Sequence, residues 1–63
     1  MKDRYALVKT MQGNYYYCKS GYNNFDFTTN PVKINSILIP LSNIEYIRLG
    51  LSYNEVMDII HSI

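Results

Sequence analysis

Cys18 and His61 are the side chains best suited to covalent chemistry, because they are the only cysteine and the only histidine in the chain. A cysteine nucleophile needs a base such as an imidazole beside it to form its thiolate. The two residues are far apart in the sequence, and neither lies in a signature of a cysteine enzyme. Cys18 falls in a run typical of a β-strand, and His61 lies near the end of a predicted helix, where its cationic form would suit the helix dipole. We therefore expect no catalytic activity.

Metal and phosphate sites are not indicated either. A structural zinc site takes four ligands, mostly cysteine or histidine, and this chain has one of each. Its carboxylates show no metal-ligand spacing. Gly13, Gly21 and Gly50 are isolated from one another, so the sequence has no glycine-rich phosphate loop. We expect neither a metal nor a cofactor.

Tyrosine is the residue type that stands out, with seven copies in 63 residues. In a strand, Tyr15, Tyr16 and Tyr17 alternate in direction, so either Tyr16 points inward and its neighbours outward, or the reverse. Exposed tyrosines offer rigid, amphipathic contact area of the kind that interfaces favour. Tyrosines are equally good strand formers whose cross-strand pairs stabilise a sheet. Both interpretations stay open, and the candidate binding residues are Lys9, Tyr15, Tyr17, Lys19 and Tyr22.

The lysines near these tyrosines suggest a second kind of partner. Lys9, Lys19 and Lys33 alternate along the chain with the tyrosines, and aromatic rings beside cations can stack and hold single-stranded nucleic acid. The formal net charge of +1 is too small to indicate such a partner by itself. A nucleic-acid- or nucleotide-binding small barrel is therefore the alternative to a protein-binding domain.

Five strands are predicted to hold these residues, at about 5–11, 14–19, 25–28, 32–39 and 43–49. The first carries apolar side chains on both faces, so we expect it to be covered on both sides. Gly13 and Asn14 tolerate a positive φ and predict a tight hairpin between the first two strands. Pro40 should mark the end of the fourth strand or an exposed edge. The fifth should run back antiparallel to the fourth.

A C-terminal helix is predicted at about 53–62. Ser52 and Glu55 form the sequence pattern of a capping box, and Leu51 and Val56 suit a hydrophobic staple. Apolar residues then recur at helical spacing; they are Tyr53, Val56, Met57, Ile60 and Ile63. A helix this short is marginal alone in water, so it must pack on the sheet.

The order of these elements predicts a single domain over 1–63 that is mainly β (α+β). We expect a small antiparallel four- to five-stranded meander sheet or a barrel, with one C-terminal helix packed on it. The strand pattern over 5–49 resembles that of Sm-like and other SH3-like small barrels. Sm-like proteins usually carry their helix before the barrel, and their Asp/Asn-bearing signature is not matched at residues 22–26. The resemblance therefore implies a fold and no binding residue.

The size of the chain favours self-association, because a domain of 63 residues buries only about 60% of its unfolded surface. A lone cysteine cannot form an internal disulfide, which leaves self-association or an unusually good core as the compensation. The start of the sequence has no signal peptide and no apolar run spans a bilayer, so we expect a cytoplasmic protein. We expect a phage or mobile-element accessory protein that forms a homo-oligomer, and that blocks a host factor or sequesters a small ligand.

Overall fold

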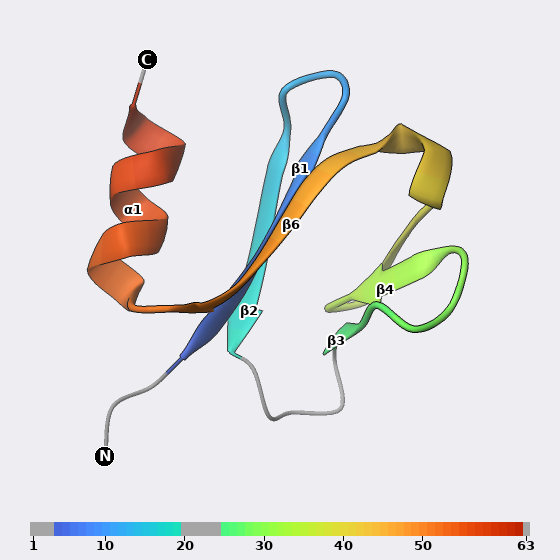
Figure 1. The fold of residues 1–63 in the computed structure, drawn as a ribbon, viewed down its shortest axis with the longest axis horizontal. Helices are drawn as coiled ribbons and strands as arrows, with labels where there is room; N and C mark the ends of the chain where they lie inside the picture. Colours follow the sequence, from blue (N-terminus) through green and yellow to red (C-terminus); the bar gives the residue numbers. More distant parts are fainter. Residues whose placement is uncertain (1–3, 20–24, 63) are drawn as a thin grey trace.

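The computed structural model describes residues 4–19 and 25–62, which form three layers (Figure 1). Sheet A is the middle layer and has the strand order β2-β1-β6. Sheet B lies on one side of it, with the order β3-β4-β5, and the helix α1 lies on the other. In chain order the elements are β1 (Tyr5–Thr10), β2 (Tyr15–Lys19), β3 (Phe25–Asp26), β4 (Val32–Ile34), β5 (Ile37–Ile39), a 3-10 helix (Leu41–Asn43), β6 (Ile44–Leu51) and α1 (Tyr53–His61).

The prediction of a mainly β chain with a C-terminal helix is confirmed, whereas the meander and the barrel are wrong. The described residues form six strands in two separate antiparallel sheets, not four or five in one. Two local features account for the difference. One is a turn that divides the predicted strand 32–39 into two. The other is a change of direction after which the last strand pairs with the first strand and not with the one before it.

The predicted strand 32–39 is a hairpin, because the chain turns at Asn35 and Ser36. Val32 pairs with Ile39 and Ile34 pairs with Ile37. Asn35 adopts a φ of 54°, a left-handed conformation that asparagine tolerates better than most residues. The sequence did contain this signal, since an Asn-Ser pair lies symmetrically between two short β-branched runs.

The last strand, β6, pairs with β1 and not with the strand before it. Pro40 ends β5 as predicted, and the 3-10 helix that follows redirects the chain toward sheet A. There Met11 donates its backbone N–H to the carbonyl of Asn43 at 2.8 Å. The register of β6 against β1 shifts twice, and Gly50, with a φ of 73°, lies in one of these bulges.

The β1–β2 hairpin is confirmed. Its turn closes with hydrogen bonds between Thr10 and Asn14, and Gly13 adopts a φ of 89°. As expected, β1 is covered on both faces: Ala6, Leu7 and Val8 are all fully buried. The centre of the molecule is therefore the middle strand of sheet A.

The helix begins as its sequence predicted. The backbone N–H of Glu55 donates to the hydroxyl of Ser52 at 3.2 Å, and the backbone N–H of Ser52 donates to Oε1 of Glu55 at 2.9 Å. Val56 is fully buried against Leu7 and Leu51, which fixes the helix on sheet A. Neither α1 nor any other helix of the described chain has the length and apolar character needed to cross a membrane.

Candidate binding face

The face of sheet A that carries the helix is the one on which tyrosines gather; we call it the helix-side face. Alternation along β1, β2 and β6 turns one set of side chains to this face and the other to sheet B. Only three side chains, Leu7, Leu51 and Val56, are buried in its core. Partly buried residues surround them, and they are Tyr5, Tyr15, Tyr17, Tyr46, Met57, Ile59 and Ile60.

Three tyrosines form a cluster at the end of the helix-side face where α1 begins; we call Tyr5, Tyr17 and Tyr53 the tyrosine triad. The ring centroids of Tyr5 and Tyr53 are 5.7 Å apart, and those of Tyr5 and Tyr17 are 6.1 Å apart. The rings of Tyr17 and Tyr53 meet edge to face at 6.4 Å. These distances mean direct contact between rings, so the triad leaves no room for a ligand between them. Tyr53 is its most exposed member, at 49%.

A second cluster lies at the hairpin end of the same face; we call Lys9, Tyr15, Glu45 and Tyr46 the lysine cluster. Nζ of Lys9 lies 5.8 Å from the ring centroid of Tyr15, 5.9 Å from that of Tyr46 and 3.5 Å from Oε1 of Glu45. The Glu45 carboxylate, and next Tyr15, raise the pKa of Lys9, which is therefore a cation at neutral pH. Burial, and next Tyr15, raise the pKa of Tyr46.

Three of the described cations lie on or next to the strands of sheet A that carry Tyr5 and Tyr17. Arg4 directly precedes Tyr5 and donates to the carbonyl of Gly50 at 3.3 Å. Lys19 is opposite Tyr5 in the β1–β2 ladder. Arg48 is opposite Leu7, which places it on the helix-side face.

Among the described carboxylates, that of Glu55 is affected by two of these cations. Hydrogen bonds with Ser52 are the main cause that lowers the pKa of Glu55, and Arg4 and Arg48 lower it further.

The structure divides the predicted site residues between the two clusters. Tyr17 belongs to the tyrosine triad with Lys19 beside it, whereas Lys9 and Tyr15 belong to the lysine cluster. Tyr22 lies outside the described residues. The roles of these residues in binding stay a prediction.

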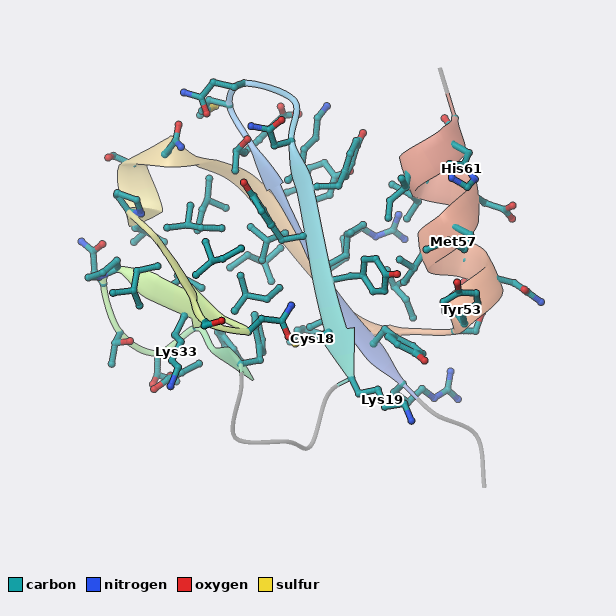
Figure 2. All side chains as sticks on the ribbon, turned by 180° about the vertical axis from the view of Figure 1, so that it is seen from behind. Cys18, Lys19, Lys33, Tyr53, Met57 and His61 are labelled. Carbon is teal, nitrogen blue, oxygen red and sulfur yellow. The ribbon has the colours of Figure 1, made fainter. Side chains whose placement is uncertain are left out.

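The expected alternation of the tyrosine run is confirmed, but neither set points outward into solvent. Tyr16 packs toward sheet B, while Tyr15 and Tyr17 pack on the helix-side face. All three are half-buried, because both faces of sheet A are covered. Lys33 lies on the far side of sheet B from these rings, so it does not join Lys9 and Lys19 (Figure 2).

The sequence prediction missed Tyr5, Arg48 and Tyr53. Tyr5 could have been found, since the antiparallel register of the hairpin brings it to the same face as Tyr17. Tyr53 was read as part of the buried stripe of the helix, but it is half exposed. Arg48 could not have been placed, because its position depends on the pairing of β6 with β1.

Cys18 and His61 lie on opposite sides of sheet A. Cys18 is buried among the side chains between sheets A and B, and burial raises the pKa of its thiol. His61 is exposed near the end of α1 (Figure 2). The two side chains therefore do not form a dyad.

Within residues 4–19 and 25–62 the structure shows no pocket and no group of three or more histidine, cysteine or acidic side chains suited to a metal ion. No family model, no curated protein and no solved structure matches this chain.

Proposed function

We propose that this chain is a non-catalytic binding protein that occupies a site on a partner protein through its helix-side face. The observation that supports the proposal most is the position of the tyrosines: four of the described six are half-buried on this one face and a fifth, Tyr53, is half exposed there. Tyrosine and arginine are the side chains that most often dominate binding energy at protein interfaces. Acting stoichiometrically, the chain would block that partner, for example a host factor, from its other interactions.

The shape of the face suits a protein better than a small ligand. The rings of the tyrosine triad are in direct contact, and Lys9 lies against two more. The described residues form no pocket, so what this face offers a partner is a surface. Tyrosines in such a surface need little conformational ordering on binding, because they have few rotatable bonds and their neighbours already hold them.

Nucleic acid is the second candidate partner, because cations accompany the tyrosines on the helix-side face. Two observations weigh against it. The cation of Lys9 is already paired with Glu45, and Lys33 lies on the other side of the molecule. Binding to phosphate would weaken steeply as salt is raised, and a measurement of affinity against salt concentration separates the two candidates.

Self-association is a further part of the proposal. Of the large apolar side chains exposed in the described part of the chain, four come from sheet B and the segments that follow its strands. They are Phe27, Ile37, Leu38 and Leu41, with Leu38 the most exposed at 62%. Sedimentation equilibrium should show a dimer or larger species, and Leu38→Ser should shift it toward the monomer. A wild-type chain that sediments as a monomer at micromolar concentration would remove this part of the proposal.

The test of the binding proposal is an affinity capture that compares two single variants with the wild type. Tyr53→Ser changes the most exposed ring of the tyrosine triad, and Lys33→Ser changes an exposed residue on the far side of sheet B (Figure 2). Circular dichroism first establishes that both variants are folded. We expect a protein that is retained in fixed ratio by the wild type and by Lys33→Ser but lost with Tyr53→Ser. If every retained protein is retained equally by both variants, the helix-side face is not the binding surface.

A further inference from the structure

The two edges of sheet A differ in what covers them. At the edge formed by β2, the carbonyl of Tyr17 accepts a hydrogen bond from the side-chain amide of Asn35 at 3.2 Å, so the turn between β4 and β5 lies against that edge. At the other edge, no described strand pairs with β6 on the side away from β1. With eight residues β6 is the longest described strand, and Arg48 and Leu49 are exposed on it. An open strand edge is a template for pairing with another strand.

The hydrogen bonds of β1 show which of its backbone groups face β6. In an antiparallel sheet, successive residues of a strand turn their N–H and C=O groups to opposite neighbours. The N–H of Thr10 donates to the carbonyl of Asn14 on the side of β2, and the N–H of Met11 donates to that of Asn43 on the side of β6. The odd-numbered residues of β1 therefore bond to β6.

This alternation identifies the backbone groups that β6 turns to its open edge. Leu7 and Lys9 are odd-numbered, and their partners in the ladder are Arg48 and Tyr46. Ile47 lies between these two partners, so its N–H and C=O point away from β1. The register shifts on both sides of this stretch, which leaves a regular segment of β6 with Ile47 at its centre.

A second copy of β6 is complementary to this edge. In a two-fold symmetric pair of antiparallel strands with the axis at Ile47, the two Ile47 residues exchange both N–H···O=C bonds, and the regular segments lie opposite each other. Tyr46 then lies opposite Arg48 of the other copy, and symmetry makes this contact twice. A guanidinium group against a tyrosine ring is attractive. The strand β6 is already ordered in the single chain, so a second copy loses less conformational freedom on pairing than an unstructured segment of another protein.

Resting on the self-association proposed above, we propose that two copies of this chain pair through the outer edges of β6, so that the two three-stranded sheets A form one continuous antiparallel sheet across a two-fold axis at Ile47.

Disulfide cross-linking in a Cys18→Ala background tests this pairing. In Ile47→Cys the two new cysteines oppose each other at about 5.5 Å between Cα atoms, which is within the range of a disulfide. Leu49→Cys is the matched control: Leu49 is 50% exposed, but in this register it lies about 14 Å along the strand from its copy. Circular dichroism first establishes that both variants are folded. Under mild oxidation, Ile47→Cys should form the linked dimer about tenfold faster or more.

A second variant tests the same pairing without a new cysteine. Arg48→Ala removes an exposed side chain and both of its contacts with Tyr46 of the other copy. The dissociation constant of the dimer, measured by sedimentation equilibrium, should rise about tenfold. Lys33→Ala removes an exposed cation from the far side of sheet B and should leave the constant within about twofold.

Two results would overturn the inference and leave self-association standing. One is cross-linking of Leu49→Cys at the same rate as Ile47→Cys or faster. The other is a dimer that Leu38→Ser dissociates and Arg48→Ala does not change, because the contact would then lie on sheet B. A wild-type chain that is a monomer would instead refute self-association itself, and the open edge of β6 would be left to a strand of another protein.

Discussion

The two faces of sheet A are built from alternate residues of the same strands, yet they differ in composition. Toward sheet B the buried core is mainly aliphatic, with Ala6, Val8 and Cys18 packed against Ile34 and Ile39, and Tyr16 lies at its border. Toward the helix only three residues are buried, and tyrosines surround them.

The difference in composition indicates which side of sheet A stabilises the fold. An aliphatic face has no groups that seek water, so its only favourable state is burial. Tyrosines bury their rings but keep their hydroxyl groups at the surface, and so they suit a boundary that stays partly wet. We infer that the contact between sheets A and B carries most of the stability, and that the helix-side face is a thinner layer able to adjust to a partner.

The largest expected effect is that of Ile34→Ala, which empties a fully buried position between the two sheets. Both sheets surround the cavity, and neither can move into it without breaking its own ladder. We expect a loss of about 4 kcal/mol in the free energy of unfolding, in the upper part of the range for such changes. Urea denaturation followed by circular dichroism measures it. Should the variant be unfolded without urea, Ile34→Val provides a readable series, with an expected loss of about 1 kcal/mol.

Leu7→Ala is the matched change on the helix-side face, since Leu7 is also fully buried and the substitution removes the same number of carbon atoms. Here one wall of the cavity is a helix of nine residues held by a few side chains, and it can shift inward. We therefore expect a smaller loss, about 2 to 3 kcal/mol, because the cost of a cavity depends on how far its walls collapse. If Leu7→Ala costs more than Ile34→Ala in the same urea experiment, the ranking of the two faces is wrong.

The features of the fold that the sequence could predict are local ones. The turn at Gly13, the capping box at Ser52 and the burial of β1 on both sides are local patterns, and each one is present in the structure. Sheet pairing is not local. The strand that pairs with β6 is decided by which apolar surfaces pack together. Nothing in the sequence of residues 44–51 identifies β1 as that strand.

The candidate site shows the same limit. Alternation along one strand was enough to keep Tyr15 and Tyr17 together and to separate Tyr16 from them. The triad also needs Tyr53, which comes from the helix, and the lysine cluster needs Tyr46, which comes from β6. Because these contacts join distant parts of the chain, they follow from the packing of the helix and the pairing of β6.

Ser52→Ala tests how much of the helix-side layer depends on its helix cap. The hydroxyl of Ser52 accepts a hydrogen bond from the backbone N–H of Glu55, and its removal leaves that donor to water. We expect a loss of about 1 kcal/mol in the free energy of unfolding. Ser42→Ala is the control, since Ser42 is exposed in the 3-10 helix and makes no side-chain cap there. Equal effects of the two changes would mean that the cap does not stabilise the fold.

The smallest expected effect is a pH dependence that arises from Glu55. Its pKa is lower in the folded chain, mainly through the hydrogen bonds with Ser52, than in the unfolded chain, where it should lie near 4.3. The stabilisation is therefore complete above the unfolded pKa and is lost as the pH falls through the folded one.

In Glu55→Gln the amide oxygen can still accept the hydrogen bond, so the variant removes the charge alone. The free energies of unfolding of the two proteins should differ at pH 7 and converge as the pH falls through the folded pKa of Glu55. Asp26, whose pKa is lowered by Thr28, contributes equally to both proteins and cancels in the difference. A constant difference across this range would show that the carboxylate acts through its shape and not through its charge, and that the helix-side layer is no more sensitive to acid than the aliphatic one.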